Sequence, residues 1–145
     1  MKKSMWTIVI LIFLSIHSFG VSRIEVKDVW VREVPPASSV TAVYMVIENK
    51  GNEDDRLIEV KTDVSNNAVI HNTLVDEKGI AKMEKFEYIN IPSGKSVELK
   101  PSGSHIMLIG LNKSLKAGDK IELDLKFEKF GIIKARAQVK GMQSH

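Results

Sequence analysis

Cysteine is absent from the 145-residue sequence. The chain therefore cannot form disulfides, and it offers neither a thiolate metal ligand nor a thiol nucleophile. A lipid-modified bacterial lipoprotein is likewise not expected, because its anchor is attached to a cysteine. Any metal site must use side chains that tolerate an oxidising compartment, where a thiol is oxidised but a Met thioether and a His imidazole avoid disulfide formation.

A long hydrophobic run occurs only near the N-terminus. Two lysines precede a predominantly apolar stretch of twelve residues, Met5–Ile16. As a helix this stretch would span about 18 Å, which is too short for a hydrocarbon core roughly 30 Å thick. Small residues at Ser18 and Gly20 fit a signal peptidase site, and an uncleaved anchor is the alternative. We expect residues 1–20 to be a cleaved signal peptide and the mature protein to be periplasmic, without permanent membrane insertion.

Neither sign of charge dominates the predicted mature chain. Without residues 1–20 it has 19 basic and 18 acidic residues, which interleave along the sequence. No basic stripe is present, so no nucleic-acid partner is expected. Motifs for a nucleophile elbow, a P-loop, a dinucleotide fingerprint or a zinc protease are also missing, and we expect no enzymatic activity.

The remaining chain has the pattern of β-strands throughout. Runs with partial period-2 alternation are separated by Gly, Pro, Asn and Asp turn clusters, and Trp30, Tyr44 and Phe127 are expected to pack in the core. The pattern predicts an all-β fold, an antiparallel β-sandwich or barrel, with one domain over residues 21–139 and a frayed tail over 140–145. The nine predicted strands are 24–33, 41–49, 55–62, 68–75, 80–89, 95–100, 104–111, 119–129 and 133–139.

Soft metal ligands are few in residues 21–145 but regularly placed. They are His71, His105, His145, Met45, Met83, Met107 and Met142. His105 and Met107 are two apart in a predicted strand, so both side chains lie on one face. His71 and Met83 each lie six residues from Glu77, and a hairpin turning there brings them roughly opposite each other, within one residue of register. If the fold brings the two pairs together, they form a site with two nitrogen and two sulfur ligands.

This set of donors favours Cu(I). Thioether sulfur is soft and uncharged, and it binds Cu(I) well but harder divalent ions poorly. Four neutral ligands leave only the charge of the metal, which suits a monovalent ion. Taken singly, a strand histidine is usually a surface residue and a strand methionine usually fills the core, which is the interpretation kept for Met45. Local geometry alone leaves both interpretations of the other residues open.

The spacing of these residues resembles the signature of the PCu(A)C-type periplasmic copper chaperones. That signature is a His usually followed by Met, then ten residues, a Met, twenty-one residues and His-x-Met. Here His71-Asn72 is followed by ten residues, Met83, twenty-one residues and His105-Ile106-Met107. Flanking segments such as TAVYMVIENKG are similar too, and the resemblance covers about residues 25–139. The one departure is Asn72, which replaces the usual Met and is expected to face the opposite side of its strand from His71.

The resemblance implies a cupredoxin-like β-sandwich that binds Cu(I) through His71, Met83, His105 and Met107. It also implies delivery of copper in the periplasm to the CuA site of cytochrome c oxidase subunit II, or to a Sco-type assembly partner. A periplasmic copper-buffering or resistance protein is the alternative, and a metal-free exported binding module is a second. Some members carry a His- and Met-rich tail, of which Met142 and His145 would be a reduced, nonfunctional version. We expect the protein to be a monomer.

Overall fold

The computed structural model describes the backbone of residues 20–141 and the side chains of these residues except 73–75 and 83. The predicted signal peptide, apart from Gly20, and the tail residues Met142 and His145 lie outside this range. Within it the chain is all-β, as predicted, and nowhere forms a helix of the length and apolarity that a membrane crossing needs. The strands are β1 (Ile24–Arg32), β2 (Val40–Asn49), β3 (Asp55–Lys61), β4 (Ser65–Val75), β5 (Ala81–Phe86), β6 (Ile89–Ile91), β7 (Ser96–Leu99), β8 (His105–Leu111), β9 (Lys120–Phe127) and β10 (Gly131–Lys140).

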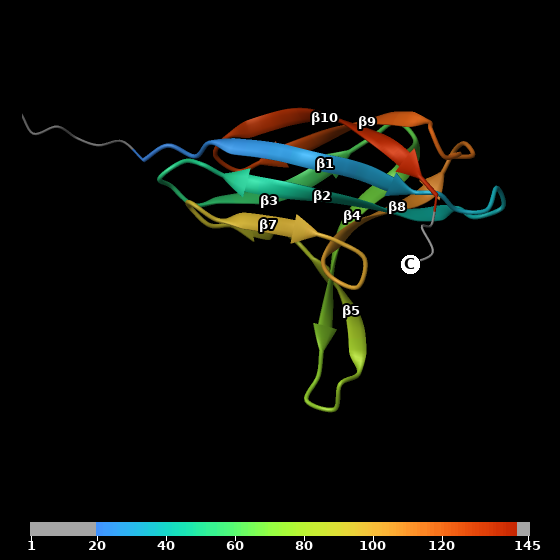
Figure 1. Cartoon of the computed structure of the whole chain (residues 1–145), viewed down its shortest axis with the longest axis horizontal. Coiled ribbons are helices and arrows are strands. Elements are labelled where there is room, and N and C mark those ends of the chain that lie inside the picture. The colour runs from blue at the N-terminus through green and yellow to red at the C-terminus, as the bar shows by residue number, and fades with distance from the viewer. Residues whose placement is uncertain (1–19, 142–145) are drawn as a thin grey trace, which may run out of the picture.

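The strands form one continuous sheet that curls on itself into a sandwich. Their order is β5-β4-β8-β2-β1-β10-β9-β3-β6, and β7 pairs with the part of β2 that β8 leaves unpaired. Figure 1 shows β9 and β10 along one side of the body, β7 along the other, and β1 and β2 between them. The core enclosed by the curl contains Phe127, Met45, Ile47 and Leu57, each at most 1% exposed. The core interpretation of Met45 and Phe127 is therefore confirmed.

One pair of strands departs from the predicted antiparallel arrangement. β1 and β10 run parallel, with Trp30 opposite Gln138 and Val31 opposite Val139. Parallel neighbours need a long connection between them. The whole intervening chain provides that connection, because β1 and β10 are the first and last strands of the domain.

The predicted strand 80–89 is two strands rather than one. Its first part, β5, pairs with β4, whereas its last residues enter β6, which pairs with β3. A chain that changes partners must break its ladder, and the break falls at Glu87 and Tyr88. Apolar alternation does not reveal such a change, because the side chains keep the same period on both sides of it.

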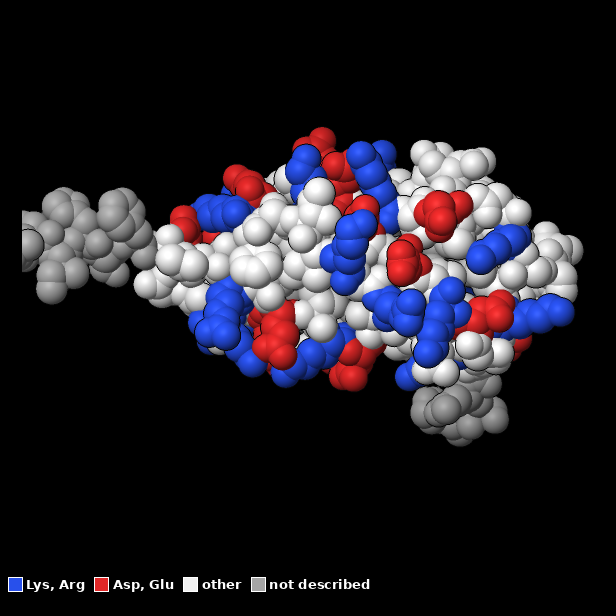
Figure 2. Space-filling view, turned by 90° about the horizontal axis from the view of Figure 1, so that it is seen from above, with Lys and Arg blue, Asp and Glu red and all other residues white. Residues whose placement is uncertain are grey.

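The face formed by β9 and β10 carries charges of both signs, as Figure 2 shows from above. Lys134 lies 3.7 Å from Asp124 across the two strands, and Arg136 lies 3.9 Å from Glu122. The intervening side chains of β10, such as Ala135 and Ala137, are buried. This alternation is the solvated strand face that the interleaved charges predict.

The hairpin of β4 and β5 projects from the body of the sandwich (Figure 1). Its turn is closed by Asp76, whose side-chain Oδ1 accepts hydrogen bonds of 2.9 Å from the backbone N–H groups of both Lys78 and Ile80. Gly79 adopts a φ of 79°, a conformation that side chains with a Cβ rarely take. The loop between β7 and β8 projects on the same side of the body as the hairpin. His105 is the first residue of β8 after this loop, and His71 is the last residue of β4 that pairs with β8.

Candidate metal centre

Two histidines from different strands meet on the outer face of the sheet. His71 of β4 is directly opposite His105 of β8 in an antiparallel pair. Their ring centroids are 5.6 Å apart and the ring planes are nearly perpendicular, at 81°. His105 is 5% exposed, and Ile106 beside it points the other way into the core at 0%. The fold thus brings together the two predicted imidazole ligands, one from each of the predicted pairs.

The orientation of His105 is set by the loop that precedes β8. The loop closes tightly, with hydrogen bonds of 3.0 Å from Gly103 N–H to the Lys100 carbonyl and from Lys100 N–H to the Ser104 carbonyl. The Nδ1 atom of His105 lies 3.0 Å from the Gly103 carbonyl oxygen. Because a carbonyl only accepts, Nδ1 carries the proton and donates it, which leaves the lone pair on Nε2. A backbone carbonyl often orients a metal-binding histidine in this way.

His71 has a buried ring nitrogen with no hydrogen-bond partner. Its Nδ1 is the one buried side-chain nitrogen or oxygen without a partner among the side chains that the structure describes. Burial, the neighbouring His105 and Lys85 together hold the pKa of His71 below its usual value of 6.5. The ring is therefore neutral at pH 7 and can offer a lone pair. An unpartnered buried polar atom is costly, and a bound metal ion is one group that would remove the cost.

Met107 lies on the same face as His105, two residues along β8. The residues between and after them, Ile106 and Leu108, are fully buried in the core, whereas Met107 is half-buried on the outer face. Met107 is opposite Val69 of β4 and Ala42 of β2, small and medium-sized apolar residues. The His-x-Met motif thus presents a nitrogen and a sulfur donor on one face, as period-2 alternation predicts.

The prediction that His71 lies opposite Met83 to within one residue is wrong, because the turn of the β4–β5 hairpin is centred one residue later than predicted and the pairing register is therefore shifted by two residues. His71 is opposite Lys85, and Met83 is opposite Thr73. The hydrogen bonds of Asp76 close the turn around Lys78 instead of Glu77, which shifts every pair along the hairpin. The shift leaves position 83 on the face of position 71, because alternation repeats every two residues, but makes the two diagonal neighbours. Diagonal Cβ atoms are about 7–8 Å apart, compared with about 5 Å for a direct pair.

Asn72, at the position where the signature usually has Met, is held on the other face of β4. Its Oδ1 accepts a hydrogen bond of 2.6 Å from the Ser104 hydroxyl. This bond ties β4 to the loop before His105. Asn72 therefore links the two elements that carry the histidines. The prediction that it faces away from His71 is confirmed.

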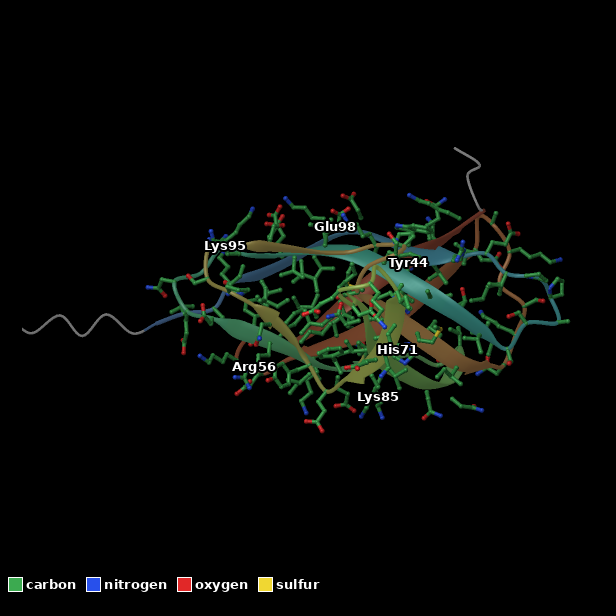
Figure 3. The ribbon with its side chains drawn as sticks, turned by 90° about the horizontal axis from the view of Figure 1, so that it is seen from below. Tyr44, Arg56, His71, Lys85, Lys95 and Glu98 are labelled. Atoms are coloured by element: carbon green, nitrogen blue, oxygen red, sulfur yellow. The ribbon has the colours of Figure 1, made fainter. Side chains whose placement is uncertain are left out.

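An aromatic row beside the histidines was not predicted as part of the site. The Tyr44 ring lies 6.4 Å from that of His105, and the Trp30 ring lies 4.6 Å from that of Tyr44. Burial raises the pKa of Tyr44 above its usual value of 10.0, and Arg32 opposes part of this rise. Figure 3 shows Tyr44, His71 and Lys85 following one another in that order across the face seen from below. Tyr44 is only 4% exposed and keeps water from one side of His105.

A β-bulge places Trp30 in this row. The pairing of β1 with β2 changes register between Lys27 and Trp30, where Asp28 has a φ of 52°. The extra residue brings Trp30 directly opposite Tyr44. The sequence of β2 does not show that Tyr44 lies on the outer face, because Tyr44 and its core neighbours Val43 and Met45 are all buried and form one continuous apolar run.

Comparisons with known proteins agree on the family of this chain. The model of the family described as "Putative lipoprotein LpqE-like" matches residues 24–139. The "Putative lipoprotein Lxx21020" of Leifsonia xyli subsp. xyli is 30% identical over 104 residues, which are 72% of this chain and 61% of that relative. The chain therefore spans less than two thirds of that relative.

Solved structures match over most of the chain. The copper-bound PCuAC domain from PmoF2 is 26% identical with a TM-score of 0.72, over 86% of this chain and 97% of that domain. The Cu(I) form of DR1885 from Deinococcus radiodurans is 26% identical with a TM-score of 0.64, over 88% of this chain and 83% of that protein. This chain therefore belongs to the LpqE-like family and has the cupredoxin-like β-sandwich of the PCuAC domains.

Proposed function

We propose that the protein binds one Cu(I) ion through His71, Met83, His105 and Met107. The observation that carries this proposal is the direct pairing of two histidines, one whose Nδ1 donates to a backbone carbonyl and the other with an unpartnered buried nitrogen. Met107 joins them from the same face, and the hairpin register gives position 83 that face as well.

The donor set favours copper in its lower oxidation state. Two thioethers are soft ligands that suit Cu(I), and two imidazoles add nitrogen donors that copper also accepts. The two thioethers carry no charge, and the pKa of His71 is held below its usual value, which favours its neutral ring. The copper-bound PmoF2 domain and the Cu(I) form of DR1885 share the fold, which supports the same cargo here.

We further propose that the protein is exported and acts as a copper chaperone, delivering to the CuA site of cytochrome c oxidase subunit II or to a Sco-type partner. A site with four protein ligands has no open position for a substrate, so transfer suits it better than catalysis. The half-buried Met107 and the projecting hairpin leave the metal within reach of an incoming ligand. The predicted cleavage point is compatible with the fold, because the residue directly after it is already held by the body: the N–H of Val21 donates a hydrogen bond of 2.7 Å to Asn52 Oδ1.

Transfer to an apo CuA domain tests the chaperone function. We expect the Cu(I)-loaded protein to lose its copper to that domain when the two are mixed, as measured by metal analysis after separation. In the Met83→Ala, Met107→Ala double variant, the affinity for Cu(I) should fall by more than about tenfold. Lys82→Gln, beside Met83 but on the other face of β5, is the matched control and should bind and transfer as the wild type does.

The outcomes test the copper ligands and the chaperone function separately. Unchanged Cu(I) affinity in the double variant would refute the thioether ligands. Tight Cu(I) binding without transfer to the CuA domain or to a Sco-type protein would favour a copper-buffering protein. In that case a deletion strain would keep its oxidase activity in the absence of added copper.

A further inference from the structure

Two rows of paired positions surround the metal centre, and they contain one cation, Lys85. One row of paired positions runs from Lys85 through His71 and His105 to Tyr44 and Trp30. The next row contains Val69, Met107 and Ala42. Among these described positions, Lys85 is the one charged residue. An ion held in this centre therefore has the positive charge of Lys85 in the row of its two histidines, whereas Glu98 of the same face lies outside the two rows, opposite Val46.

Lys85 is the cation closest in register to the ligands. It is directly opposite His71, and Cβ atoms of such pairs are about 4.5–5.5 Å apart. Within residues 20–141 no carboxylate lies at ion-pair distance from its ammonium, whereas Lys82 on the same strand pairs with Glu84 at 3.7 Å. The charge of Lys85 also reaches the ligand, because it contributes to the lowered pKa of His71 after burial and His105.

We propose that Lys85 is a specificity-determining residue that makes the centre favour a monovalent over a divalent ion. This inference rests on the proposed Cu(I) site and adds a mechanism for its selectivity. The four ligands are neutral, so the bound ion keeps its full charge. The repulsion between Lys85 and a doubly charged ion is twice that for a singly charged ion, and the difference acts directly on the ratio of the two affinities.

The size of this effect follows from Coulomb's law. An ammonium roughly 8 Å from the ion, at an effective dielectric constant of about 20–40, changes the ratio of Cu(I) to Cu(II) affinity by about five- to thirtyfold. Reversing the charge at this position doubles the effect on a logarithmic scale. Salt screens it, because the Debye length falls from about 30 Å at 0.01 M to about 3 Å at 1 M.

The test compares charge variants at one position. Cu(I) and Cu(II) affinities are measured separately, with competing chelators, for the wild type, Lys85→Gln, Lys85→Glu and the charge-conserving Lys85→Arg. We expect the ratio of Cu(I) to Cu(II) affinity to fall about five- to thirtyfold in Lys85→Gln, further in Lys85→Glu, and less than about twofold in Lys85→Arg. Lys82→Gln, on the other face of β5, is the matched control and should keep the wild-type ratio.

A redox titration gives an independent reading. Each tenfold fall in the ratio lowers the midpoint potential of the bound Cu(II)/Cu(I) couple by about 59 mV. The ratio of the wild type should also fall as salt is raised from 0.01 M to 1 M, which requires no substitution. An unchanged ratio in Lys85→Gln and Lys85→Glu, with Cu(I) still bound, overturns the inference and leaves the proposed function intact. Failure of the wild type to bind Cu(I) at all overturns both.

Discussion

Replacement of His105 by alanine should lower the Cu(I) affinity by more than about a hundredfold, because loss of a ligand costs more than the roughly 10- to 100-fold effect of an outer partner. His105 is the proposed ligand whose ring is already oriented, by its hydrogen bond of 3.0 Å to the Gly103 carbonyl. It also packs against His71 and Tyr44, so its loss removes a donor and opens one side of the centre to water. Competition with a chromophoric Cu(I) chelator measures the change.

The matched comparison is His71→Ala, which removes the other proposed ligand of the histidine pair. We expect a loss of similar size and no further large loss in the double variant, since the remaining thioethers hold the ion weakly in either case. The sandwich should stay folded in all three variants, as judged by circular dichroism, because the core lies on the other face of the sheet. A His105→Ala protein with wild-type affinity would rule out the histidine pair as the metal centre.

The largest effect on stability is expected for Asp55→Asn. Asp55 is 2% exposed, and its carboxylate accepts backbone hydrogen bonds from Arg56 at 2.8 Å, Lys129 at 2.9 Å and Phe130 at 3.0 Å. An amide keeps only one acceptor oxygen and turns a donor toward a donor, so the free energy of unfolding should fall by about 3 kcal/mol. For a domain of this size that corresponds to a fall in Tm of roughly 8–15 °C. Thermal unfolding at pH 7 measures it.

The dependence on pH distinguishes this account from a simple packing defect. Burial raises the pKa of Asp55, but the three backbone N–H donors and the Ser22 hydroxyl outweigh it and hold the pKa below its usual value of 3.8. The stabilisation is therefore complete above that usual value and is lost as the pH falls through the lower pKa of the folded state. The difference between Asp55→Asn and the wild type should shrink in that acid range. Asp54→Asn, at an exposed neighbour with one bond to Ser93 N–H, should change the unfolding free energy by less than about 1 kcal/mol.

Local pattern was enough to predict most of the strands and one half of the site. Alternation placed His105 and Met107 on one face because their strand has a buried side, marked by Ile106 and Leu108. It also placed Asn72 on the face opposite His71. These statements depend only on residues within a few positions of each other, where the period of a strand decides the geometry.

Relations between distant segments could not be predicted in this way. The pairing of His71 with His105 depends on which strand lies beside β4, and no local signal specifies that neighbour. The resemblance to a known family supplied it as an expectation. The turn of the hairpin was predicted one residue too early and its pairing register was wrong by two residues, because Asp76 accepts hydrogen bonds that close the turn around Lys78. The place of Tyr44 beside the histidines could not be predicted, because its strand is buried on both faces and shows no alternation. The burial of Asp55 could not be predicted either, because the residue stands in a polar turn cluster.

The most direct test of the copper site is X-ray absorption spectroscopy at the copper edge on the Cu(I)-loaded protein. We predict a Cu(I) edge with two nitrogen and two sulfur scatterers in the first coordination shell, and the loss of both sulfur scatterers in the Met83→Ala, Met107→Ala variant. A wild-type spectrum that contains no sulfur scatterer, or that is the same in the double variant, would contradict the assignment of the metal centre.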